Sequence, residues 1–141
     1  MEGVYIGNDE VTATKYALEK KEGITDTGSS CIVGPTEEVL AIIEMLVLHL
    51  SYYADHVNWK YMFYCSEIPN LPNLNILFGG YWFEVRPVDY AVVIGEATYP
   101  DGTVSETLCA FCLMNSSDDK WILGDSFMRG WYVIHEYSNA R

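Results

Sequence analysis

The chain has 141 residues, half of them hydrophobic and 14% aromatic, with 20 acidic against 8 basic side chains and a formal net charge of −12. This length fits a single domain with one sizeable core, and the composition excludes an intrinsically disordered chain. An acidic surface repels phosphate backbones, so we expect no nucleic-acid partner.

The first half of the chain predicts two strands, a third short strand and one helix. Residues 3–7 and 11–18 alternate like the strands of a hairpin, and residues 23–25 form a further strand. Pro35, Thr36 and two acids then predict the first turn of a helix. The apolar face of this helix is expected to contain Val39, Leu40, Ile42, Ile43, Leu46, Val47 and Leu50, widened by Met45 and Leu48.

The second half of the chain is predominantly strand by pattern. We expect strands at 61–65, 73–78, 81–85, 91–94, 104–114, 121–123 and 131–137. The pair Gly79-Gly80 predicts a tight hairpin turn, residues 99–103 a second turn and residues 115–119 a loop. Residues 86–90 and 125–130 are expected to be short helical turns. The predicted fold class is therefore all-β with minor helix.

No segment predicts a membrane span. The longest apolar run, residues 39–50, contains Glu44 and His49 and is too short to cross a bilayer. The residues after Met1 lack the basic and apolar regions of a signal peptide, so we expect no targeting signal in this chain.

The four cysteines are Cys31, Cys65, Cys109 and Cys112. Cys109 and Cys112 form a CxxC pair, but a zinc site would need a second pair and no histidine lies near, so we expect no metal. One disulfide, from Cys65 to either Cys109 or Cys112, is favoured instead. Cys31 would then be a buried thiol.

The candidate site is the sequence Asp26-Thr27-Gly28, which follows the strand at 23–25. Ser29 and Ser30 come next, and then apolar residues and the helix, so the loop is expected to lie between buried elements. A carboxylate held there must be satisfied by neighbouring donors. The amide of Gly28 and the hydroxyls of Thr27 and Ser29 are within reach along the chain.

Four segments carry a resemblance to a known family. The stretch GITDTGSSCIVGPTEEVLAIIEML resembles the second active-site segment of the pepsin-like aspartic proteases, in which apolar-apolar-Asp-Thr-Gly-[Ser/Thr]-Ser precedes Gly-Pro and a helix. CSEIPNLPNLNILFGGYWFEVRPVDYAV, WILGDSFMRGWYVIHEY and MEGVYIGN are similar to three further landmarks, in the family's order. The resemblance implies that residues 1–141 are a single domain, the C-terminal lobe of the bilobal pepsin-like fold, with the N-terminal lobe absent from this chain.

The resemblance also implies roles for individual residues. Asp26 would be the catalytic aspartate of this lobe. Cys65 would form the lobe's disulfide with a cysteine near 109, for which the sequence offers both Cys109 and Cys112. Support of the active-site loop would come from Thr27, Gly28, Ser29, Ile122, Leu123 and Gly124, with Thr27 cross-linking the loops of the two lobes.

The chemistry of this family needs two carboxylates that share one proton, and it needs no cofactor. This chain has one Asp-Thr-Gly. Asp101 is followed by Gly-Thr instead of Thr-Gly and lies in an evident turn. Asp125 is expected to cap the short helix after Gly124. The second aspartate would therefore come from an N-terminal protease lobe or another protein chain, and the isolated chain would be inactive.

Three hypotheses follow. The first is a lobe of an aspartic endopeptidase that hydrolyses a polypeptide substrate through a bound water. The second is a non-catalytic protease-like lobe that acts as a structural or binding subunit of a larger assembly. The third is a homodimer of the retroviral protease type. By resemblance, the protein is expected in lysosomes or vacuoles, or outside the cell.

Overall fold

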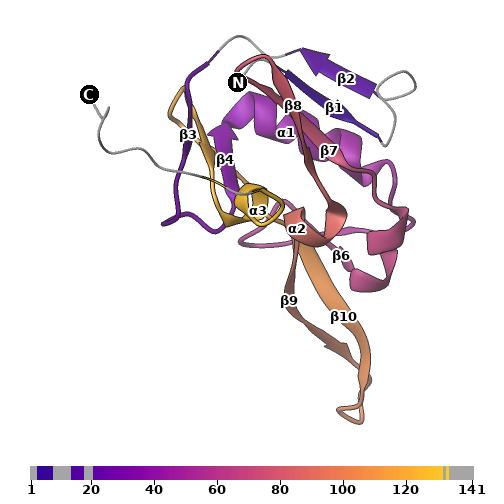
Figure 1. The fold of residues 1–141 in the computed structure, drawn as a ribbon. Coiled ribbons are helices and arrows are strands. Elements are labelled where there is room, and N and C mark those ends of the chain that lie inside the picture. The colour runs from indigo at the N-terminus through magenta and orange to yellow at the C-terminus, as the bar shows by residue number, and fades with distance from the viewer. Residues whose placement is uncertain (1–2, 8–13, 18–20, 132, 134–141) are drawn as a thin grey trace.

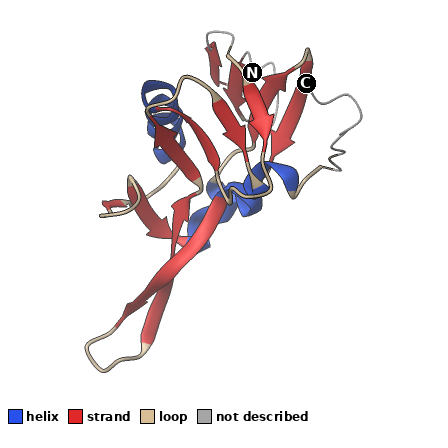
Figure 2. Cartoon of the chain, turned by 90° about the vertical axis from the view of Figure 1, so that its left-hand side faces the viewer, coloured by secondary structure: helices blue, strands red, loops and turns tan. Residues whose placement is uncertain are grey.

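The computed structural model describes residues 3–7, 14–17, 21–131 and 133 of the chain. The strand expected at 131–137 lies largely outside the described residues. Among those described, strands predominate and form three four-stranded sheets with a few helices (Figures 1 and 2). The predicted fold class, all-β with minor helix, is confirmed.

The first sheet is entirely antiparallel and contains both predicted hairpins. Its strands, in spatial order, are β2 (Thr14–Ala17), β1 (Gly3–Ile6), β7 (Leu74–Phe78) and β8 (Tyr81–Val85). Gly79 and Gly80 join β7 to β8 with φ of 59° and 82°. Two successive positive φ angles match the right-handed twist of a two-residue hairpin, and glycine adopts them without strain.

The second sheet ends in a long hairpin that projects from the body of the molecule (Figure 1). Its strands are β5 (Ala54–Asp55), β6 (Tyr61–Tyr64), β10 (Val104–Phe111) and β9 (Ala91–Thr98). The tip is the predicted turn, where the amide of Tyr99 donates to the carbonyl of Thr103 at 2.8 Å. The single strand expected at 104–114 is wrong, because Cys112 interrupts it and the chain enters a different sheet.

The third sheet places the candidate site. Its order is β11 (Leu113–Ser116), β4 (Ile32–Pro35), β12 (Trp121–Leu123) and β3 (Gly23–Thr25). Strand β11 is parallel to β4 and β12 is parallel to β3, whereas β12 and β4 are antiparallel. Strand β11 takes up two residues of the expected loop 115–119. Since β12 lies between β3 and β4, it runs beneath the loop that joins those two strands.

Helix α1 (Thr36–Val47) follows β4 and packs its apolar face into the core. The predicted start and most of the predicted face are confirmed. The helix ends before Leu48, whose side chain is 81% exposed, so the expectation that Leu48 widens the apolar face is wrong. Leu48 lies one turn beyond the exposed Glu44, on the side of the helix that faces solvent. No helix among the described residues is long and apolar enough to cross a membrane.

Three short helices complete the fold. They are η1 (Cys65–Asn70), α2 (Pro87–Tyr90) and α3 (Asp125–Met128). Helix α3 has Gly124 in the capping position and no side-chain cap, so the expected role of Asp125 as N-cap is wrong. The backbone amide of Asp125 instead donates to the carbonyl of Ser29, in the loop between β3 and β4.

Two disulfides link the cysteines, Cys65 to Cys109 and Cys31 to Cys112. The first resolves the choice between Cys109 and Cys112. The second overturns the expectation that Cys31 is a free buried thiol. The parallel pairing of β11 with β4 places Leu113 opposite Ile32, so the residues that precede them, Cys112 and Cys31, also come together.

Candidate active site

Asp26 begins the loop that leaves β3, at the end of β12. Its amide donates to the carbonyl of Leu123 at 3.1 Å, which continues the pairing of β3 with β12 by one residue. The loop then turns through Thr27 and Gly28 and returns to β4. The position of Asp26 is thus fixed by two adjacent strands rather than by the loop alone.

Both carboxylate oxygens of Asp26 have a donor within the loop. The amide of Gly28 donates to Oδ1 at 2.8 Å, and the hydroxyl of Ser29 donates to Oδ2 at 3.1 Å. The amide of Ser29 also donates to the carbonyl of Asp26 at 3.2 Å. A Cβ at Gly28 would lie 3.2 Å from Oδ1, so glycine permits this close approach. The carboxylate is oriented and remains partly exposed, and it can therefore bind a water or a second acid.

The other residues expected to support the loop lie around it. Ile122 and Leu123 belong to β12, and Thr27 is exposed at the top of the turn. A Cβ at Gly124 would overlap the carbonyl oxygens of Ser29 and Cys31, so the end of β12 touches the backbone of the loop directly. The structure thus brings together all six of these residues and Asp26.

The sequence alone did not reveal the contacts on the far limb of the loop, residues 29–31. The amide of Asp125 donates to the carbonyl of Ser29 at 2.8 Å, and both the amide and the hydroxyl of Ser126 donate to the carbonyl of Ser30 at 3.0 Å. Ser126 is fully buried. The only sequence signal for Ser126 is its place two residues after Gly124, and this is a weak signal because a serine there can have many roles.

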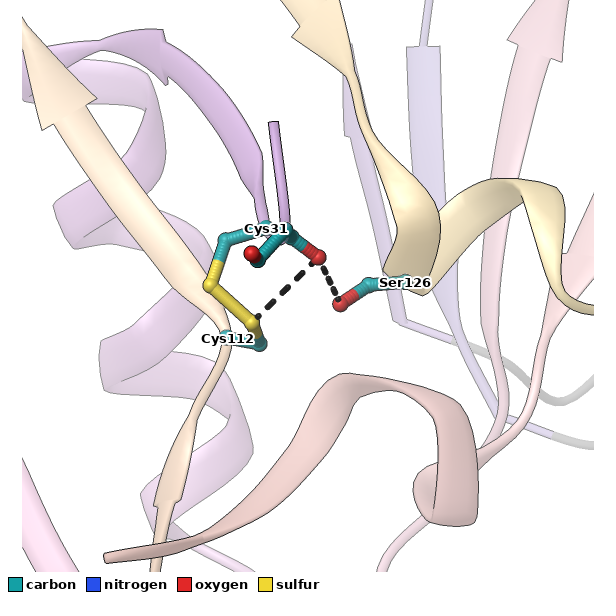
Figure 3. Close-up of a disulfide and its surroundings, with 4 residues drawn as sticks. Cys31, Cys112 and Ser126 are labelled. Carbon is teal, nitrogen blue, oxygen red and sulfur yellow. Dashed lines mark hydrogen bonds between the residues drawn. A yellow bond between two sulfur atoms is a disulfide. The ribbon is translucent and has the colours of Figure 1, made fainter. Parts of the chain in front are cut away.

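The disulfide of Cys31 and Cys112 lies against the same carbonyl oxygen of Ser30 (Figure 3). The Sγ of Cys112 is 3.7 Å from this oxygen. A sulfur in a disulfide has no proton to donate, so this is a packing contact. The far limb is therefore held by Ser126 on one side and by the disulfide on the other.

A partly buried ion pair contacts Trp121, the first residue of β12. Glu38 of α1 accepts a hydrogen bond from the indole Nε1 of Trp121 at 3.0 Å and lies 3.1 Å from the ammonium of Lys21. Lys21 also contacts Asp119 at 2.6 Å. Hydrogen bonds from the ammonium to Asp119 and then Glu38 raise the pKa of Lys21 above its usual range. These contacts connect β12 to the helix and to the chain before β3.

An apolar pocket of about 250 Å³ lies beside the strand that leads into Asp26. Its lining residues are Thr25, Phe78, Phe83, Leu123, Phe127, Trp131 and Val133. Phe83 contacts both Phe127 and Trp131 edge to face. Trp131 is 40% exposed, whereas Trp121 is buried in the core.

A β-rich lobe that carries an Asp-Thr-Gly loop over an Ile-Leu-Gly strand has the arrangement of one half of an aspartic protease. The comparison with family models agrees, because the model described as eukaryotic aspartyl protease matches residues 1–141. The chain belongs to the eukaryotic aspartyl protease family.

Curated relatives show the same family. The chain is 29% identical to cathepsin D of Homo sapiens over 125 residues, covering 85% of this chain and 27% of that protein. It is 37% identical to napsin-A of Homo sapiens over 113 residues (78% of this chain, 24% of that protein). It is 29% identical to the embryonic pepsinogen of Gallus gallus over 139 residues (96% and 32%). The chain thus spans a third or less of the length of these relatives.

Proposed function

We propose that this chain is the C-terminal lobe of a pepsin-like aspartic endopeptidase and that Asp26 is one of its two catalytic aspartates. The observation that carries the proposal is the pair of hydrogen bonds from Gly28 and Ser29 to the two oxygens of Asp26. Such donors hold a carboxylate in one orientation before substrate arrives. The carboxylate of Asp101, in an exposed turn, also accepts from a neighbouring amide, but the loop of Asp26 is in addition bound to β12 by the hydrogen bond from the Asp26 amide to the carbonyl of Leu123.

The reaction requires a second carboxylate close to Asp26. In this class of enzyme two facing aspartates share one proton, an established property of the class. The ionised aspartate takes a proton from a bound water, and the resulting hydroxide attacks the peptide carbonyl while the protonated aspartate polarises it. The tetrahedral intermediate then breaks its C–N bond as a proton passes to the leaving amine. No metal or organic cofactor takes part in this sequence.

The second aspartate comes from an N-terminal lobe, on another chain or in a longer protein of which this chain is a part. Thr27, exposed at the top of its loop, is in a position to meet the matching loop of that lobe. The substrate is an extended polypeptide, bound by strand-like backbone hydrogen bonds. Two disulfides favour an oxidising compartment such as a lysosome, a vacuole or the extracellular space.

The experiment compares Asp26→Asn with Asp101→Asn, a matched change at an exposed aspartate in the β9–β10 turn. Hydrolysis of an unfolded protein is measured at about pH 4, with and without an N-terminal lobe and with a pepstatin-like inhibitor as control. We expect activity only when that lobe is present, lost in Asp26→Asn and kept in Asp101→Asn.

Two other results would overturn the proposal. Activity of the isolated chain that Asp26→Asn abolishes would support a homodimer. A stable complex without hydrolysis, or hydrolysis that Asp26→Asn leaves unchanged, would support a structural or binding subunit.

A further inference from the structure

Ser29 connects the far limb of the active-site loop to the carboxylate. Its hydroxyl donates to Oδ2 of Asp26, and its own carbonyl accepts from the amide of Asp125. The next two residues, Ser30 and Cys31, are held by Ser126 of α3 and by Cys112, which precedes β11. Any movement of residues 29–31 is therefore transmitted to the donor on Oδ2.

Two side-chain features hold this limb, and we call them the loop clamp: the hydroxyl of Ser126 and the disulfide between Cys31 and Cys112. Ser126 donates to the carbonyl of Ser30 at 3.0 Å and is fully buried, and Cys31 and Cys112 are 5% and 2% exposed (Figure 3). The backbone joins the same elements, since the amide of Ile32 donates to the carbonyl of Cys112 at 3.1 Å. The clamp thus joins the loop to two distant segments through three buried side chains.

We propose that the loop clamp positions the catalytic loop, so that Ser126 and the Cys31–Cys112 disulfide act on catalysis through Ser29 and Asp26 without touching substrate. The inference rests on the function proposed above for Asp26. The other disulfide, Cys65–Cys109, joins β10 to η1, and neither of these elements contains Ser126 or Cys112. The two disulfides therefore have different roles: one fixes the geometry of the loop and the other stabilises the lobe.

The test uses the assembled two-lobe protease and separates kcat from KM. We expect the double variant Cys31→Ala/Cys112→Ala to lower kcat about tenfold with KM within about twofold, because the reacting groups are misaligned while the cleft is intact. Cys65→Ala/Cys109→Ala is the matched control and should lower the melting temperature with kcat within about twofold at a temperature where the protein is folded. Equal effects of the two double variants on kcat would overturn the proposal.

Ser126→Ala keeps the proposal testable if a double variant does not fold, because the change removes one oxygen and leaves the amide contact. We expect kcat to fall about threefold at unchanged KM, roughly the effect of one weakened hydrogen bond. Unchanged kcat in Ser126→Ala would overturn the role of the hydroxyl. Asp26→Asn is measured alongside, since activity that survives that change refutes the proposed function itself, whereas activity lost there and kept in the clamp variants refutes only the clamp.

Discussion

Gly124 offers the sharpest test of how closely β12 and the loop 26–31 are packed. A Cβ at this position would overlap the carbonyl oxygens of Ser29 and Cys31 and lie 2.7 Å from the carbonyl carbon of Ser29. These neighbours are all backbone atoms, so no side-chain rotation relieves the clash. Relief requires the loop and the start of α3 to separate, which also breaks the hydrogen bond from Asp125 to Ser29.

Gly124→Ala should therefore destabilise the chain strongly for so small a change. Overpacking costs about 1–3 kcal/mol, and backbone neighbours place this site at the upper end. The broken hydrogen bond adds about 1 kcal/mol. We expect a loss of roughly 3–4 kcal/mol, which for a chain of this length lowers the melting temperature by about 10 °C, since the unfolding entropy is near 2 cal/mol/K per residue.

Urea unfolding followed by circular dichroism measures this loss. Gly95→Ala is the control, because a Cβ there meets nothing within 4 Å and the residue has no positive φ. It should change the free energy of unfolding by less than about 0.5 kcal/mol or stabilise slightly. A loss below about 1 kcal/mol in Gly124→Ala would refute the close approach.

Three further measurements test other contacts. Trp121→Phe replaces the buried indole by a smaller ring and removes the donor to Glu38, and urea unfolding should show a loss of about 1–3 kcal/mol; no measurable loss would contradict the bond. Hydrogen bonds from the amide and hydroxyl of Thr103 hold the pKa of Asp101 below its usual range, so a carbon NMR titration should show Asp101 ionised at pH values where an aspartate of ordinary pKa is still protonated. The stability from this bond is then present above the ordinary aspartate pKa and lost as pH falls through the lowered value. Burial raises the pKa of Tyr90, so above about pH 10 the Tyr90 hydroxyl ionises only in the unfolded chain. The free energy of unfolding should therefore fall with pH by up to about 1.4 kcal/mol per pH unit more than it does in Tyr90→Phe. Equal slopes in the two proteins would show that Tyr90 is not the cause.

Local signals in the sequence predicted the local structure well. The hairpin at Gly79-Gly80 needs positive φ at two successive residues, and a glycine pair announces this directly. The start of α1 was equally readable, because proline and two acids mark a first turn. The end of α1 was harder to predict, because Leu48 is apolar like the helix residues before it. Its side chain nevertheless faces solvent, on the same side as Glu44.

Pairings between distant segments could not be read in this way. The disulfide between Cys31 and Cys112 spans 81 residues, and only the parallel register of β11 with β4 brings the two cysteines together. The sequence left Cys65 to pair with either Cys109 or Cys112, whereas in the structure an interruption between β10 and β11 separates the two cysteines, and they bond to different partners. The sequence contains no separate signal for that interruption.

The loop 26–31 shows both situations within six residues. From Asp26 to Ser29 the contacts join residues two and three positions apart, so the local sequence Asp-Thr-Gly-Ser is enough to predict them. From Ser29 to Cys31 the contacts come from residues 81 to 96 positions away. A chain could therefore keep the four letters and lose the geometry of the carboxylate through changes near Gly124 or Ser126. Because Ser29 takes part in both sets of contacts, it is the residue through which such distant changes would reach Asp26.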